Sequence, residues 1–207
     1  MILNPYLIII TLGLSLFLHQ LFHKIYLKKN LIDQVNDRSS HISSATRSGG
    51  LSVFITIFLV SLYYYISGYT IFDFSIIIPL ALLTFVGLYD DVYNVDFKLK
   101  FIFQIIAAKI IVDNGLIIDN LHGVFGLYEI SRILAQLLTI LVIVSIINAI
   151  NFIDGLDGLA ISITIIFIAS FQFFAFLNPD FYYLSIIITT CLIPLYYFNF
   201  RNKNKVF

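Results

Sequence analysis

Long uninterrupted apolar runs are the feature that most restricts how this chain can fold. Each run approaches the roughly 20 residues that a helix needs to cross a bilayer. Seven of them cover about residues 2–22, 50–67, 71–89, 101–118, 130–150, 159–177 and 181–200. The runs are continuous rather than alternating, which favours helices over strands. We therefore expect an all-α, polytopic transmembrane helix bundle of about seven spans, with residues 1–207 forming a single transmembrane domain.

Composition supports a membrane protein and excludes other classes. The chain is 60% hydrophobic and 12% charged, with a mean hydropathy of +0.97, whereas a soluble domain is about a quarter charged. Its net charge is zero, so nothing points to a nucleic-acid partner. Cys191 is the single cysteine, which excludes an intrachain disulfide and a cysteine-based zinc site. No Lys or Arg precedes the first run, so residues 1–22 are expected to form a span rather than a cleavable signal peptide.

Basic residues orient these spans, because Lys and Arg collect in cytoplasmic loops. Ten of them fall after the first, third and seventh spans: Lys24, Lys28, Lys29, Arg38, Arg47, Lys98, Lys100, Arg201, Lys203 and Lys205. The opposite side would carry only Arg132 among several carboxylates. We therefore expect the N-terminus outside and the C-terminus in the cytoplasm. Three polar islands, at 33–50, 90–100 and 151–158, would then all face the cytoplasm.

The first island could bind phosphate. Arg38, His41 and Arg47 are cationic or can become so. Gly49-Gly50 precedes a predicted helix, whose free N–H groups suit an anion. The simpler alternative is a basic loop that binds anionic lipid headgroups, and this island alone favours that alternative.

The second island combines adjacent carboxylates with lysines. Asp90 and Asp91 end a predicted span, where the repulsion of like charges does not help folding. They make sense beside a divalent cation, a lysine or a proton to be moved, and Lys98 and Lys100 follow within reach. Mg²⁺ takes one or two carboxylates plus substrate phosphates. The alternative is a solvated helix end with weak ion pairs, and we favour the functional interpretation.

The third island repeats a carboxamide or carboxylate every third residue, at Asn148, Asn151, Asp154 and Asp157. Three residues of a straight helix turn through about 300°, so the first and last side chains would point to opposite sides. Gly155 and Gly158 permit a break. We therefore expect a helix that ends near Asn151, followed by a turn that presents the two aspartates. An ordinary capping turn before the sixth span would explain part of this pattern, but not the two asparagines.

Together the islands describe a site for an anionic, phosphorylated cytosolic substrate with a divalent metal, since such a site works mainly by positioning and charge. A membrane-embedded co-substrate would explain its place at the bilayer edge. In order, the islands resemble the motifs of the polyprenyl-phosphate N-acetylhexosamine-1-phosphate transferases, integral membrane enzymes that begin cell-envelope polysaccharides. The matched residues are Asp33, Arg38, His41 and Arg47-x-Gly49-Gly50; Gly87-x-x-Asp90-Asp91 with Lys98, Lys100 and Gln104; and Asn148 through Leu159.

This resemblance implies a reaction. A phospho-N-acetylhexosamine passes from a UDP-sugar to polyprenyl (undecaprenyl) phosphate, UMP is released, and Mg²⁺ assists, with Mn²⁺ as the alternative. It also implies a multi-pass protein of the bacterial inner (cytoplasmic) membrane with its active face in the cytoplasm. The sequence leaves the oligomeric state open, with a homodimer among the options.

The resemblance also implies residue roles. Asp90 and Asp91 would serve the polyprenyl phosphate or its deprotonation, and Lys100, with Lys98 as a second candidate, would hold phosphate. Asn151 matches a Mg²⁺ ligand. Asp154 and Asp157, with Asp90 and Asp91 the candidate catalytic residues, would shape the nucleotide and metal pocket, and Asn148 would support them. The remaining candidates for substrate binding are Arg38, His41, Arg47 and Asn199.

Two departures from the family pattern affect these expectations. Gln34-Val35 replaces the Lys-Pro that often follows the first aspartate. The sequence also stops at Phe207, before a Met-Gly-Asp whose aspartate is the family's other Mg²⁺ ligand. We therefore expect a C-terminally truncated chain that is inactive alone.

Two other classes of protein compete with the enzyme. A catalytically inactive membrane scaffold stays open as an alternative. A transporter is disfavoured, because its polar residues would lie in mid-span rather than at the cytoplasmic ends.

Overall fold

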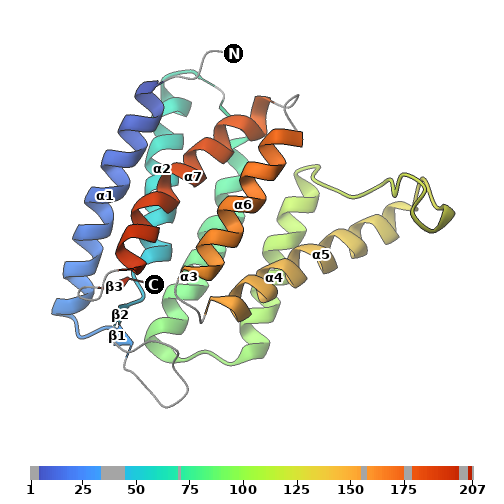
Figure 1. The fold of residues 1–207 in the computed structure, drawn as a ribbon. Coiled ribbons are helices and arrows are strands. Elements are labelled where there is room, and N and C mark those ends of the chain that lie inside the picture. The colour runs from blue at the N-terminus through green and yellow to red at the C-terminus, as the bar shows by residue number, and fades with distance from the viewer. Residues whose placement is uncertain are drawn as a thin grey trace. The chain divides into compact units, whose positions relative to one another are not determined.

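The computed structural model describes residues 5–33, 45–69, 71–154, 158–174, 179–200 and 205–206. Over these residues the chain forms seven α-helices (Figure 1): α1 (Pro5–Lys28), α2 (Gly49–Ile66), α3 (Ile77–Tyr93), α4 (Phe97–Asp113), α5 (Arg132–Ile153), α6 (Leu159–Phe174) and α7 (Pro179–Asn199). Two 3-10 turns, η1 (Phe74–Ile76) and η2 (Val124–Gly126), and three short strands, β1 (Ile32–Asp33), β2 (Ala45–Thr46) and β3 (Lys205–Val206), complete the described elements. The helical architecture is as predicted, and the strands are an addition to it.

Five of the described helices are long and apolar enough to cross a membrane: α1, α2, the stretch Phe74–Tyr93 that contains α3, α5, and Phe181–Asn199 within α7. The other two predicted spans correspond to shorter helices, since α4 has 17 residues and α6 has 16. The chain is therefore a multi-pass membrane protein by its helix composition.

The helix expected at 101–118 is α4, which begins and ends about one turn earlier. Asp96 is its extended N-cap, with ψ 140°, and its carbonyl accepts the N–H groups of Leu99 and Lys100. The far end stops before Gly115, which has a left-handed φ of 91°. Lys109 forms an exposed ion pair with Asp113 one turn further along α4.

The described residues form two compact units, one from 1–74 with 153–207 and the other from 75–152. In the first unit, α1 packs against α2 and α7, and α6 packs against α7. Small polar side chains line these contacts: the Ser15 hydroxyl, fully buried on α1, donates to the Cys191 carbonyl of α7 at 3.2 Å. Small residues let helix backbones approach closely, as is usual in membrane bundles.

A three-stranded sheet closes one end of this unit, with β2 between β1 and β3. The strand β2 pairs antiparallel with β1, and parallel with β3 in the register Ala45↔Lys205 and Thr46↔Val206. Ala45, Thr46 and Val206 are all buried. The sheet therefore fixes the residues that lead into the Arg47-x-Gly49-Gly50 segment.

In the second unit, α3 and α4 pack against each other as a helical hairpin with a short connection. Asn94 ends α3 in a left-handed conformation, with φ 49°, and its N–H donates to the Asp90 carbonyl at 2.9 Å. On α4, Ala107 and Ala108 are fully buried. The tight turn brings the end of α3 beside the start of α4, where the second polar island lies.

Candidate functional site

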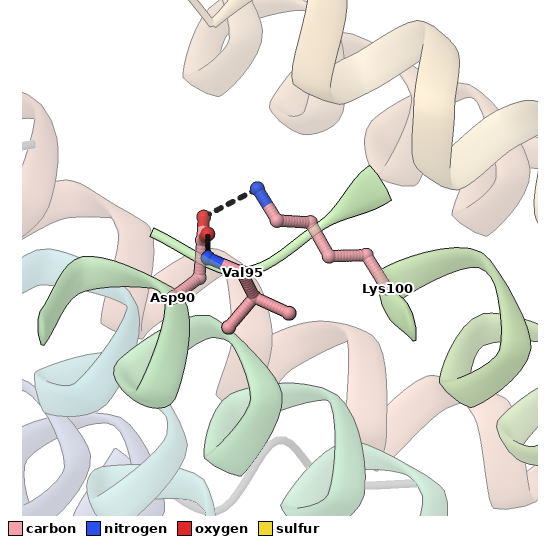
Figure 2. A network of polar contacts seen from close by, with 3 residues as sticks. All are labelled: Asp90, Val95 and Lys100. Atoms are coloured by element: carbon pink, nitrogen blue, oxygen red, sulfur yellow. Dashed lines mark hydrogen bonds and ion pairs between the residues drawn. The ribbon is translucent and has the colours of Figure 1, made fainter. Parts of the chain in front are cut away.

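Asp90 and Lys100 meet across the turn between α3 and α4 (Figure 2). One carboxylate oxygen of Asp90, Oδ2, lies 2.7 Å from Lys100 Nζ, and the other, Oδ1, accepts the Val95 backbone N–H at 2.9 Å. The two side chains are 25% and 32% exposed respectively, so the pair remains accessible from outside. A lysine ammonium has three N–H donors. Asp90 accepts one of them, and this contact restricts where the ammonium lies.

Gln104 and Asn148 join α4 to α5. Asn148 Nδ2 donates to Gln104 Oε1 at 2.7 Å and to the Val144 carbonyl at 2.8 Å. Gln104 is buried, and a buried amide is costly unless it is hydrogen-bonded. This bond therefore fixes Asn148, the first polar residue of the third island, against α4.

One stripe of α4 carries both of these contacts. Lys100 and Gln104 are four residues apart, so they lie on the same helix face with a rise of about 6 Å between them. Lys100 reaches Asp90 of the second island, and Gln104 reaches Asn148 of the third. The structure thus brings the second and third islands to one side of α4.

The end of α5 carries the remaining described residues of the third island. The helix ends at Ile153, close to the predicted end near Asn151, and Asp154 lies in the turn that follows. Asn151 and Asp154 are both exposed. Although Asp154 keeps contact with solvent, partial burial removes hydration from its carboxyl and raises its pKa above the ordinary value.

Gly158 precedes α6 under a strict steric requirement. Its φ is +68°, and a Cβ at this position would lie 2.1 Å from Phe200 Cε2. A side chain would therefore be strained by the positive φ, and the exposed Phe200 ring would have to move aside. Gly158, one of the two glycines expected to permit a helix break, adopts this backbone conformation without strain.

The described end of the first island is supported by buried polar groups. His23 Nδ1 of α1 is hydrogen-bonded to Thr46 Oγ1 at 2.8 Å, and Thr46 Oγ1 to Ser48 Oγ at 3.1 Å. Arg47 lies between these two residues and is exposed. These hydrogen bonds were not predicted, because a histidine at the end of an apolar run was their only signal in the sequence.

The other predicted site residues differ in their surroundings. Lys98 is exposed on the first turn of α4, and Asp91 is half-buried beside Asp90. Asn199 is 3% exposed, and its Nδ2 donates to the Val206 carbonyl at 3.1 Å, so it holds β3 against α7. Arg38, His41 and Asp157 lie outside the described residues.

Comparison with known proteins identifies the family. Residues 73–207, more than half of the chain, match Glycosyl transferase family 4. The chain belongs to glycosyl transferase family 4. No curated protein matches it. Family 4 consists of prenyl-phosphate sugar-1-phosphate transferases, so the resemblance is confirmed at the family level. The matched residues include the second and third islands, and the first island precedes them.

Family 4 implies a metal-dependent transferase. Over the described ranges, no three His, Cys, Asp or Glu side chains cluster in a way that could hold a metal ion. Mg²⁺ does not require such a cluster, since it binds through one or two carboxylates, waters and substrate phosphates. Exposed oxygen donors such as Asn151 and Asp154 fit this mode of binding, in which phosphate completes the coordination.

Proposed function

We propose that this family 4 protein transfers a phospho-N-acetylhexosamine from a UDP-sugar to polyprenyl phosphate and releases UMP. The observation that carries the proposal is the stripe of α4, where Lys100 is held by Asp90 and Gln104 holds Asn148. An oriented and accessible ammonium is well suited to bind a phosphate substrate. A purely structural role explains this ion pair less well, because an accessible ion pair contributes little to stability.

In the proposed reaction, an oxygen of polyprenyl phosphate attacks the β-phosphorus of the UDP-sugar. The bond between the β-phosphorus and the oxygen that bridges it to the α-phosphate breaks, and that oxygen leaves with UMP. The two remaining N–H groups of Lys100 hold phosphate oxygens, while Asp90 keeps the lysine in position. Asp91 is the proposed acceptor of any proton that the polyprenyl phosphate still carries.

The proposed Mg²⁺ site uses the oxygen of Asn151, with Asp154 and Asp157 beside the nucleotide. Mg²⁺, or Mn²⁺ in its place, would neutralise charge on the diphosphate as UMP leaves. Arg38, His41 and Arg47 are proposed to bind further phosphate or sugar groups of the UDP-sugar, and Lys98 is a second phosphate contact. We place this chemistry at the cytoplasmic face of a bacterial inner membrane, where the UDP-sugar is available.

The test is transfer by the full-length gene product in lipid vesicles. UDP-N-acetylglucosamine, undecaprenyl phosphate and Mg²⁺ are supplied, and both UMP and the lipid diphospho-sugar are measured. Asp91→Asn should lower the rate roughly 100-fold, as expected for loss of a general base. Asp96→Asn is the matched control, because Asp96 is an exposed carboxylate on the same turn and makes no side-chain cap on α4. Equal rates in the two variants would refute the assignment.

A further inference from the structure

The connection between α4 and α5 is a tightly hydrogen-bonded hairpin loop, defined here as residues 116–131. Backbone bonds cross it from Leu121 N–H to the Tyr128 carbonyl at 2.7 Å and from Ile130 N–H to the Asp119 carbonyl at 3.1 Å. Its base is tied to α5, since the Ile118 N–H donates to Thr139 Oγ1 at 2.9 Å. The hairpin loop is therefore a built element with a fixed connection to α5.

The tip of the hairpin loop presents apolar side chains outward. Phe125 is 96% exposed, and Val124, Leu127 and Tyr128 are also exposed. Residues 116–131 contain no lysine or arginine. An exposed apolar patch of this kind marks a surface that is covered either by a membrane or by another molecule.

Phe125 occupies an unfavourable backbone conformation. Its φ is 54° and its ψ is 24°, in the left-handed region that bulky residues avoid. Gly123 and Gly126 adopt positive φ in the same turn without this cost. A strained residue is retained where something compensates for the strain, so the outlier points to a role for the projecting ring.

Chain continuity identifies what covers the tip. The candidate span α5 begins at Arg132, directly after the hairpin loop, and has a mean hydropathy of 2.5. Phe125 is seven residues from that start, a reach of at most about 25 Å even when fully extended. Tyrosine, here Tyr128, is typical of the boundary between lipid and water, because its ring is apolar and its hydroxyl is polar.

We propose that the hairpin loop inserts its tip into the interfacial layer of the bilayer, at the ends of α4 and α5 that are remote from Lys100 and Asn151. Phe125 enters among the upper acyl chains, and Tyr128 stays at headgroup depth. Because the loop has no lysine or arginine, insertion relies on apolar burial rather than on anionic lipid. The insertion anchors the start of α5, the helix whose other end carries Asn148 and Asn151.

The absence of tryptophan from the sequence gives a clean test. Phe125→Trp in the full-length protein becomes the only tryptophan of this segment, and any tryptophan elsewhere is replaced by phenylalanine. The protein is reconstituted in phosphatidylcholine vesicles whose lipids are brominated near the headgroup or near the chain end. Leu141→Trp, an exposed position in the middle of α5, serves as the matched control for depth.

Insertion predicts that the shallow bromines quench Phe125→Trp at least twofold more than the deep ones, with little quenching by aqueous acrylamide. Leu141→Trp should show the reverse preference between bromines. Full access to acrylamide would place the tip in water and overturn the proposal. A blue-shifted emission that neither type of bromine quenches would show that protein covers the tip, and would overturn it as well.

A second variant separates anchoring from folding. Phe125→Asn removes the ring but suits the left-handed backbone, so the thermal midpoint in detergent should stay the same or rise. In this background, the quenching of Leu141→Trp should move measurably between the shallow and deep bromines as α5 changes depth. An unchanged quenching profile would refute the anchoring role.

Discussion

Lys100 and Asp90 form an ion pair that fixes the position of the lysine ammonium but contributes little to the stability of the fold. Pairs with this degree of solvent contact contribute only about 0–1 kcal/mol to stability. Yet Asp90 uses both carboxylate oxygens, one on Val95 N–H and one on Lys100, to fix where the ammonium lies. We therefore expect substitutions here to change catalysis more than folding.

Lys100→Met should lower the transfer rate by roughly 10- to 100-fold, because one charge-assisted contact to phosphate is lost, and leave the thermal midpoint within a few degrees. The control is Lys109→Met, which removes an exposed ion pair with Asp113 at the other end of the same helix. Steady-state rates and thermal unfolding of both variants distinguish the roles. Equal activities would show that Lys100 is only a surface residue.

Gly158→Ala should destabilise the protein by about 1–2 kcal/mol, chiefly through strain at positive φ, with a smaller cost for displacing the exposed Phe200 ring. Gly13→Ala on α1 is the control, because a Cβ there meets nothing within 4 Å. Thermal unfolding in detergent measures both. Adding Phe200→Ala to Gly158→Ala should recover the part of the loss that comes from the clash, and no recovery would contradict the steric explanation.

Asp154 makes the proposed reaction sensitive to acid. Burial raises the pKa of its carboxyl, so the carboxylate form is lost at a higher pH than for an ordinary aspartate. We expect the transfer rate to fall as the pH drops through this raised value, and Asp154→Asn to remove that limb of the profile at a lower overall rate. The dependence of kcat/KM on pH tests this expectation. If the fall in rate at acidic pH persists unchanged in Asp154→Asn, it arises from the titration of another group.

At the scale of elements, one face of α4 contacts both α3, through Lys100, and α5, through Gln104. The contribution of the hydrogen bond between Gln104 and Asn148 to the free energy of unfolding can be measured. Each single change to leucine should cost about 1–3 kcal/mol, because a polar partner is left unpaired. The double variant should lose less than the sum, with a coupling of about 0.5–1.5 kcal/mol. Gln104 paired with Ser145, an exposed neighbour on α5, is the control cycle and should show no coupling.

The elements differ in how well the sequence predicts them. Long apolar runs locate the helices, and the glycines near Asp154 locate the break after α5. Residue spacing also predicts that a lysine lies within reach of Asp90, as the contact with Lys100 shows, while the chemical roles of these residues stay predictions. The strands are not predictable, because two residues carry no periodicity and β2 pairs with residues at 205–206. Nor does the sequence predict that Thr46 bonds to His23, since that contact depends on how α1 packs.

At the scale of the whole molecule, the sheet ties the ends of the first unit together through Val206. This residue is fully buried in β3, and its carbonyl accepts the amide of Asn199. Val206→Asp should destabilise the unit by about 3 kcal/mol or more, because it buries a charge without a partner, while Val206→Ala should cost about 1–2 kcal/mol. Thermal unfolding gives the ranking, and faster hydrogen exchange at Ala45 and Thr46 should accompany it. Equal losses in the two variants would contradict burial of a charge as the cause.

The pairing of β2 with β3 also sets an order of events during synthesis. The ribosome makes β3 about 160 residues after β2, a delay of roughly 8 to 32 s at 5–20 residues per second. Throughout that time α1 and α2 can enter the membrane, while Ala45 and Thr46 cannot yet form their parallel pairing with β3. The segment that carries Arg47 therefore leaves the ribosome well before β3 and reaches its final pairing only after β3 has been made.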